Sequence, residues 1–189
     1  VQEILGTDNS VGRFKCQKIK SNKLGVSGWI QGTGYTGEEG VEIFLNGHDS
    51  RILWGTLFSH PDVTPVGLGA RDTLRLEKGY LLSGQDFLWP GLGVAESLPE
   101  GFLSRNTSET AVPFGLDLSH DFIGKESLIS SMESDSKMWG MICVERGPSP
   151  RPGHAVFSGP SDDSEIIGYV TSGAPSPSLG MTGIAMGYL

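Results

Sequence analysis

The chain has 189 residues, of which 37% are hydrophobic and 19% are charged, so it is long enough and apolar enough to form a folded core. The 22 acidic residues outnumber the 14 basic ones, and the formal charge of −8 argues against nucleic-acid binding, which needs Lys and Arg to neutralise phosphates. The two cysteines and four histidines lack metal-ligand spacing, and no apolar stretch is as long as a membrane span, so we expect neither a metal site nor a membrane segment.

The opening residues up to Lys23 are polar and predict no element. The first elements that the sequence predicts form a hairpin. Residues 26–31 predict a short strand, and residues 41–45 form a β-branched and aromatic run typical of strands. The connection between them, residues 32–40, is dense in glycine, as tight turns require. Two strands joined by such a connection predict a β-hairpin.

Two helices follow the hairpin. Asp49 or Ser50 can cap a helix that runs to about Ser59, with apolar residues at helical spacing on one face. Those residues are Leu53, Trp54, Leu57 and Phe58. A second, shorter helix is expected from Arg71 or Asp72 to Lys78, with Gly79 as its stop signal.

The rest of the chain changes character twice. Residues 89–110 are rich in Gly, Pro, Ser, Glu and Asn and predict a surface insertion that contributes little to a core. Asp121 is expected to cap a third helix that buries Leu128, Ile129 and Met132. Strands are then expected over 137–145, 166–171 and 184–189, separated by turns, with a domain boundary near 130–136.

Glu42 is the first candidate site residue. Strand alternation places it on the face opposite Val41 and Ile43, where a carboxylate either meets water or lines a binding site. Such a carboxylate can accept two adjacent N–H donors, which is what the amino group and ring N–H of a reduced pterin present. The residues alone leave both interpretations open.

Arg71 and Tyr35 are further candidates. The positive end of a helix dipole disfavours Arg at a helix start, so Arg71 there predicts a partner, either Glu42 or an anionic ligand. Tyr35, in the glycine-rich turn, can stack on a ligand ring or pack on its own hairpin. Arg75, one turn later, is an alternative to Arg71, although a salt bridge to Asp72 or Glu77 is its more ordinary role.

Serine-rich runs near the end of the sequence, at 171–173 and 176–178, raise the question of a nucleophilic serine. No His or Asp stands in a recognisable nucleophile-elbow context beside them. We therefore interpret both runs as loops, and we assign no catalytic residue.

Four motifs, in this order along the chain, resemble the aminomethyltransferase family, the T-protein of the glycine cleavage system. The family's closing strand also resembles residues 184–188 (IAMGY). The motifs are residues 34–43 (GYTGEEGVEI), 69–79 (GARDTLRLEKG), 121–128 (DFIGKESL) and 168–179 (GYVTSGAPSPSL). The resemblance covers the chain from about Gly28 to Leu189. The chain departs from the family in the insertion at 89–110 and at both ends, where an acidic residue central to the transfer and a further folate-contacting arginine of the family are absent.

This resemblance implies an α+β fold, with a ferredoxin-like folate-binding domain over residues 1–135. A truncated antiparallel β-barrel domain would follow over 136–189. The chain begins at Val1 without Met and stops within a predicted strand, so we expect an internal fragment of a longer enzyme that is inactive by itself.

The resemblance also implies a function and a site. In the family, Glu42 and Arg71 align with folate-contacting residues, and Tyr35 lies in the same motif. The implied reaction transfers a one-carbon unit from an aminomethyl-lipoyl group on a carrier protein, the H-protein, to tetrahydrofolate with release of ammonia. This glycine catabolism belongs to one-carbon metabolism, in the cytoplasm of a prokaryote or the mitochondrial matrix of a eukaryote.

Two alternatives share the implied fold. One is a folate-dependent demethylase that acts on a methylated amine or sulfonium. The other is a folate-binding, non-enzymatic factor of iron–sulfur maturation, which typically carries a reactive cysteine in its signature turn. Residues 34–37 of this chain, Gly-Tyr-Thr-Gly, contain no cysteine.

Overall fold

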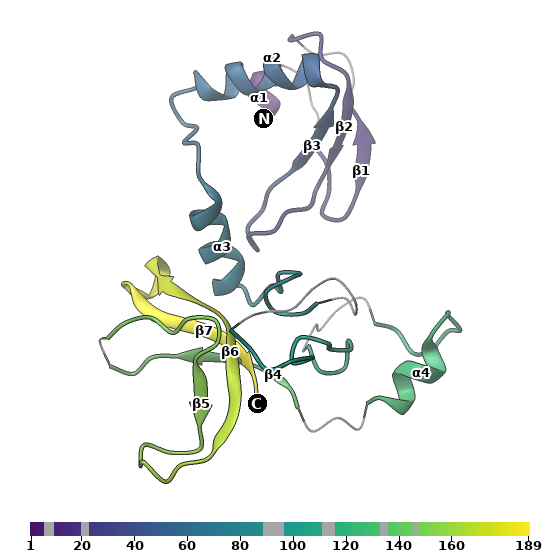
Figure 1. Cartoon of the computed structure of the whole chain (residues 1–189). Coiled ribbons are helices and arrows are strands. Elements are labelled where there is room, and N and C mark those ends of the chain that lie inside the picture. The colour runs from purple at the N-terminus through teal and green to yellow at the C-terminus, as the bar shows by residue number, and fades with distance from the viewer. Residues whose placement is uncertain (6–9, 20–22, 89–96, 111–115, 133–135, 146) are drawn as a thin grey trace. The chain divides into compact units, whose positions relative to one another are not determined.

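The computed structural model describes residues 1–5, 10–19, 23–88, 97–110, 116–132, 136–145 and 147–189 (Figure 1). The chain forms two compact units, Val1–Leu74 and Arg75–Leu189, and the division falls inside helix α3 (Leu68–Glu77). Each unit contains one antiparallel sheet, which confirms the predicted α+β class. The domain boundary at 135/136 stays a prediction. Among the described helices, none has the length and apolar character needed to cross a membrane.

The first unit is built on a three-stranded antiparallel sheet in the order β1-β2-β3. Its elements before α3 are α1 (Gln2–Leu5), β1 (Cys16–Lys18), β2 (Gly28–Gln31), β3 (Glu42–Leu45) and α2 (Gly47–Phe58). The predicted hairpin is therefore confirmed as β2 and β3. The sequence pattern did not predict α1 or β1, because both are short and lie in a polar segment.

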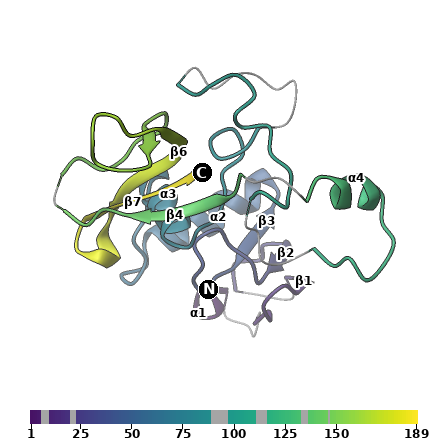
Figure 2. The same ribbon diagram turned by 90° about the horizontal axis from the view of Figure 1, so that it is seen from below.

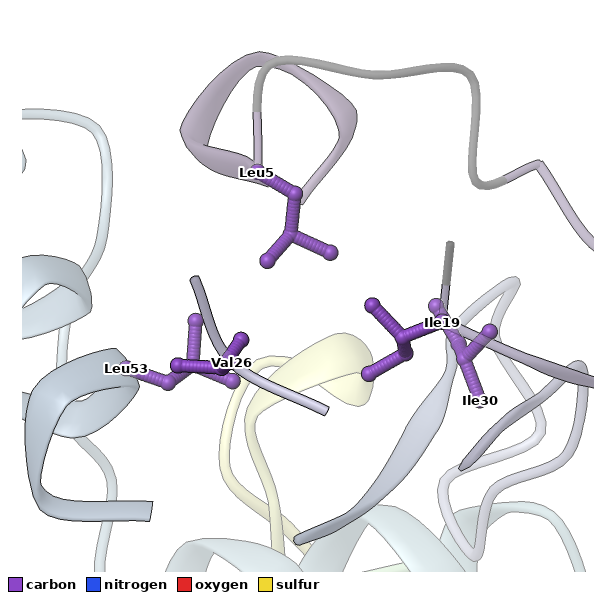
Figure 3. Close-up of a cluster of buried hydrophobic side chains, with 5 residues drawn as sticks. All are labelled: Leu5, Ile19, Val26, Ile30 and Leu53. Atoms are coloured by element: carbon purple, nitrogen blue, oxygen red, sulfur yellow. The ribbon is translucent and has the colours of Figure 1, made fainter. Parts of the chain in front are cut away.

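The core of this unit gathers apolar side chains from both helices and from the sheet side. Figure 3 shows them pointing toward one another. They are Leu5, Ile19, Val26, Ile30 and Leu53, all at most 8% exposed. Since Ile43 packs against this cluster, one face of the sheet is apolar and covered, and the other face carries the alternate residues of each strand.

Helix α2 differs from its prediction in cap and in face. Its N-cap is Asn46, whose side-chain oxygen accepts from the backbone N–H groups of the next turn, whereas Asp49 is buried and accepts from the Ser27 amide at 2.9 Å. Of the four residues assigned to one buried face, Leu53 and Leu57 contact the core. Trp54 and Phe58 are more than half exposed, and their rings lie 6.1 Å apart.

The second unit is built on a four-stranded antiparallel sheet in the order β4-β7-β6-β5. The strands are β4 (Met138–Ile142), β5 (Ala155–Phe157), β6 (Ile166–Ser176) and β7 (Thr182–Tyr188), with a 3-10 helix, η1 (Pro177–Leu179), between the last two. The predicted strands at 137–145, 166–171 and 184–189 are confirmed as β4, β6 and β7, and the three-residue β5 was missed. Leu76, at the end of α3, packs with Ala174, Ile184 and Met186 on this sheet.

The prediction of a coreless surface insertion at 89–110 is wrong for its described part, residues 97–110. Leu103 is 4% exposed, and the Phe102 ring meets the ring of Tyr188 edge-on at 6.0 Å. The Arg105 guanidinium lies 4.2 Å from the centroid of the Tyr188 ring and forms an ion pair with Glu109 at 3.0 Å. The composition is that of a loop, yet the segment packs against the end of β7.

Helix α4 (Lys125–Ser130) begins three residues later than predicted, because its N-cap is Gly124, in a left-handed conformation, and not Asp121. Figures 1 and 2 both show α4 away from the four-stranded sheet. Its expected buried side is not buried: Ile129 is 48% exposed and Met132 is 43% exposed.

A buried ion pair between Arg75 and Asp86 joins the start of the second unit to its sheet. The two side chains are 0% exposed and 2.5 Å apart. Both hydroxyls of Thr171 and Ser172 donate to Asp86 Oδ1 at 2.5 Å, and Arg75 also donates to Ser172 Oγ at 2.7 Å. Asp86 is therefore a buried partner of Arg75 that the sequence did not predict.

This network also corrects the interpretation of the serine-rich runs as loops. Thr171 and Ser172 lie inside β6, where they are fully buried, and Ser176 is the last residue of that strand. Glu77 accepts from the hydroxyls of Ser176 at 2.5 Å and Ser178 at 2.8 Å. These hydroxyls fasten β6 and η1 to the end of α3, which is a structural role.

Gly168 provides a test of the second sheet. An added Cβ at Gly168 would lie 2.0 Å from the backbone oxygen of Tyr188, whereas one at Gly140 of β4 would meet nothing within 4 Å. We expect Gly168→Ala to lower the free energy of unfolding by about 1–3 kcal/mol, because neighbouring backbone must move. Gly140→Ala should leave it unchanged or raise it slightly. Urea unfolding of both variants checks this, and equal stabilities would contradict the register of β6 and β7.

Candidate functional site

The three residues singled out by the sequence all lie in the first unit. Glu42 is the first residue of β3 and pairs in register with Gln31 of β2. The side chains of this pair lie on the sheet face opposite Ile30 and Ile43, which belong to the core side. Glu42 is half-buried, so it is neither a solvated surface residue nor a core residue.

The carboxylate of Glu42 is held by two neutral donors. The Gln31 amide donates to Oε2 at 3.1 Å, and the Thr33 hydroxyl donates to the same oxygen. These hydrogen bonds, first that of Thr33 and then that of Gln31, hold the pKa of Glu42 below its usual value. The positive charge of Arg71 acts in the same direction, while partial burial acts against it. The group is therefore a fixed anion at neutral pH.

Arg71 and Tyr35 form one contact. The guanidinium carbon of Arg71, on α3, lies 5.0 Å from the centroid of the Tyr35 ring, a cation–π geometry. Tyr35 comes from the turn between β2 and β3 and is half-buried, whereas Arg71 is exposed. Because α3 begins at Leu68, Arg71 lies one turn inside the helix and not at its start, as the sequence had predicted. Of the predicted partners, Glu42 or an anionic ligand, the charge of Arg71 acts on Glu42, and the ring contact with Tyr35 was not predicted.

The structure therefore brings together an oriented carboxylate, an exposed guanidinium and an aromatic ring. A carboxylate in this state can accept hydrogen bonds from amino and ring N–H groups, and the guanidinium can bind a carboxylate. Within the described residues, both side-chain donors to Glu42 reach Oε2, which leaves Oε1 without a side-chain donor. A ligand with two adjacent donors can donate to Oε1 directly. It can donate to Oε2 only by sharing that oxygen with Gln31 and Thr33 or by displacing one of them.

The same sheet face carries a row of aromatic side chains next to Glu42. Trp29 and Phe44 pair in register and are 47% and 54% exposed. The Lys18 ammonium lies 5.6 Å from the centroid of the Trp29 ring. An exposed aromatic surface beside a fixed anion is suited to a flat heteroaromatic ligand with N–H donors.

Sequence reasoning missed Gln31 and Thr33. The hairpin was predicted, but its register was not, and the register alone places Gln31 opposite Glu42. Thr33 stands between two glycines in a segment interpreted only as a tight turn. The available signal was a polar residue at the end of an apolar strand. No group of His, Cys, Asp and Glu that could hold a metal ion occurs among the residues described.

Comparison with known families matches both ends of the chain to domains of one enzyme. Residues 1–88 match a model described as the GCVT N-terminal domain. Residues 137–189 match a model described as the glycine cleavage T-protein C-terminal barrel domain.

Individual proteins support the same assignment. The chain is 37% identical over 181 residues to a probable aminomethyltransferase of Halobacterium salinarum, covering 96% of this chain and 44% of that protein. It is 35% identical over 190 residues to an aminomethyltransferase of Thermosynechococcus vestitus, covering 96% of this chain and 45% of that protein. The chain thus spans less than half the length of these relatives.

A solved structure is similar over the whole chain. The crystal structure of glycine cleavage system aminomethyltransferase T from Bartonella henselae has a TM-score of 0.67 and 28% sequence identity. The match covers 100% of this chain and 47% of that one. Fold and sequence therefore agree on the same relatives.

Proposed function

Since this chain belongs to the glycine cleavage T-protein family of aminomethyltransferases, we propose that its first unit supplies part of a tetrahydrofolate site. Glu42 is the anchor in this proposal: its carboxylate accepts hydrogen bonds from the amino group and ring N–H of the pterin. The observation that carries the proposal is the state of that carboxylate, which is half-buried, held at Oε2 and kept ionised by its neighbours.

Arg71 and Tyr35 have the second role. The guanidinium binds a carboxylate of the folate glutamate, and the aromatic ring beneath it fixes its direction. A protein with a formal charge of −8 needs a local cation to hold such an anion. Because Arg71 is exposed, its charge is accessible to a ligand without removal of a buried partner.

The reaction we propose for the protein is the one suggested by its relatives' names. A one-carbon unit passes from an aminomethyl-lipoyl group on a carrier protein, the H-protein, to tetrahydrofolate, which yields methylenetetrahydrofolate and ammonia. The residues of this chain bind and orient the folate, and positioning of this kind accounts for a large share of many barriers. We assign no acid or base for the proton transfers to this chain.

Glu42→Gln tests the folate site, because it keeps the size of the side chain but replaces an acceptor oxygen with an amide N–H donor, which cannot accept from the N–H groups of the pterin. We expect tetrahydrofolate binding to weaken by about 2–3 kcal/mol through loss of charge-assisted hydrogen bonds. Anaerobic calorimetry should be done on the longest natural polypeptide that carries this chain. Glu39→Gln is the matched control, since Glu39 is exposed in the same turn. Unchanged affinity in Glu42→Gln, or an equal loss in the control, would remove Glu42 from the site.

A further inference from the structure

Thr33 is held in place by the backbone around it. The amide of Gly32 donates to the carbonyl of Lys15 at 3.0 Å, and the carbonyl of Gly32 accepts from the amide of Phe14 at 2.9 Å. A Cβ at Gly32 would lie 2.4 Å from the carbonyl oxygen of Gly12, so this position requires glycine. The residue before Thr33 is therefore fixed on both sides by the neighbouring chain.

From this fixed position the Thr33 hydroxyl reaches across to Glu42. It donates to Oε2, the oxygen that also accepts from Gln31. Two donors converging on one carboxylate oxygen from two directions restrict rotation of the carboxylate, which directs Oε1 away from them. A binding group whose rotamer is locked by neighbouring hydrogen bonds is preorganised for its ligand.

We propose that Thr33 is a positioning residue of the folate site, whose hydroxyl holds Oε2 of Glu42 so that Oε1 is presented to the pterin donors. This inference rests on the proposed function of Glu42. Thr33 itself need not touch the ligand. It belongs to the site because it determines the direction of the carboxylate that does.

The charged and titratable groups around Glu42 are separate from Thr33. Arg71 on α3 is the charged group whose field lowers the pKa of Glu42. On the same sheet face, Cys16 stands in register beyond Gln31, and Lys18 lies one pair further along β1. Removal of the Thr33 hydroxyl leaves all of these in place, so its effect can be separated from theirs.

The direction of the pH effect follows from the hydrogen bond. Thr33 is the first cause that lowers the pKa of Glu42, so its hydroxyl keeps the carboxylate ionised to a lower pH. Without the hydroxyl, the pKa of Glu42 rises toward its usual value. As pH falls, the anion is then lost earlier, and pterin binding is lost with it.

The test compares Thr33→Val, which removes the hydroxyl at nearly constant shape, with Thr33→Ser, which restores it. The first measurement is the titration of the Glu42 carboxyl carbon by NMR in the ligand-free protein, with the signal assigned by its absence in Glu42→Gln. We expect a raised pKa in Thr33→Val and the wild-type pKa in Thr33→Ser. Matching titrations in Thr33→Val and wild type would overturn the proposal. Circular dichroism confirms that each variant is folded.

The second measurement is binding of 5-formyltetrahydrofolate, a stable reduced folate, between pH 7 and pH 4.5. We expect Thr33→Val to bind about ten-fold more weakly than wild type at pH 7, with a ratio that grows as pH falls, and Thr33→Ser to bind as wild type does. Taking the ratio cancels protonation of the ligand itself. A constant ratio of one would overturn the proposal.

The two measurements separate this proposal from the one on which it rests. If Glu42→Gln binds the folate as wild type does, the folate site is wrong and the positioning role in it is overturned. The ligand-free titration still reports whether Thr33 controls the carboxylate. If Glu42→Gln weakens binding but Thr33→Val does not, the folate site stands and the positioning role fails alone.

Discussion

Asp86→Asn is expected to destabilise the second unit by about 3–5 kcal/mol, since it removes the buried carboxylate that pairs with the buried charge of Arg75. The Asp86 carboxylate accepts from four groups: Arg75, the Leu82 amide at 2.9 Å, and the hydroxyls of Thr171 and Ser172. The side-chain amide of Asn in place of Asp86 turns one acceptor oxygen into an N–H donor, which then faces groups that are themselves donors. Small domains have total stabilities of roughly 5–15 kcal/mol, so the loss is a large share.

Hydrogen exchange can localise this effect. Peptides covering β6 and β7 should lose protection in Asp86→Asn, while peptides covering β2 and β3 of the first unit serve as an internal reference. Asp162→Asn is the matched control, because Asp162 is exposed, and it should change stability by no more than about 0.5 kcal/mol. Protection of β6 and β7 equal to that of the control would show that the ion pair does not stabilise the unit.

A double-mutant cycle measures the pair itself. Arg75→Met removes the cation and leaves a buried carboxylate, and the double variant with Asp86→Asn removes both charges. We expect the double variant to lose less stability than the sum of the single losses, with a coupling of about 1–3 kcal/mol. Additive losses would mean that the 2.5 Å contact contributes no pairwise energy.

The elements that the sequence predicted correctly are those whose patterns are local. The apolar and β-branched runs of β3 and β7 identify strands without knowledge of their partners. The cap of α2 was placed three residues late because Asp49, a good capping residue by type, is occupied by the amide of Ser27. A competing long-range hydrogen bond is not visible in local sequence.

The ion pair of Arg75 could not be predicted for the same reason. Asp86 is 11 residues away, and Ser172, the third member of the network, is 97 residues from Arg75. Local reasoning selects charges within one helical turn, such as Asp72 and Glu77. A fully buried guanidinium needs several acceptors at once, and the folded sheet supplies acceptors that lie far away in the sequence.

Only part of the candidate site could be predicted from the sequence. Glu42 and Arg71 came from the resemblance to a family, and strand alternation alone left Glu42 undecided between solvent and a site. The sequence left two roles for Tyr35, stacking on a ligand ring or packing on its own hairpin. In the structure, the guanidinium of Arg71 lies against the Tyr35 ring. Gln31 and Thr33 needed the register of the hairpin, which depends on how the glycine-rich connection closes.

The error over residues 97–110 shows where composition misleads. Gly, Pro and Ser favour turns, but they do not prevent the few apolar residues between them from packing. Phe102 and Leu103 stand side by side in such a stretch, and the amide of Leu88 donates to the carbonyl of Leu103 at 2.8 Å. The amide of Met138, at the start of β4, donates to the carbonyl of Glu109 at 2.8 Å. The segment is therefore tied to the sheet at more than one point.

Leu103→Ala should consequently lower the free energy of unfolding of the second unit by about 2–5 kcal/mol, the usual cost of a cavity at a buried leucine. Leu103 is 4% exposed, whereas Ile123, in the same unit, is fully exposed and provides the control as Ile123→Ala. Urea unfolding should give a lower midpoint for Leu103→Ala and an unchanged one for Ile123→Ala. A change below about 0.5 kcal/mol at Leu103 would restore the interpretation of 97–110 as a dispensable surface loop. A large loss instead makes this segment part of the core that supports β7, because Phe102 and Arg105 both contact Tyr188 at the end of that strand.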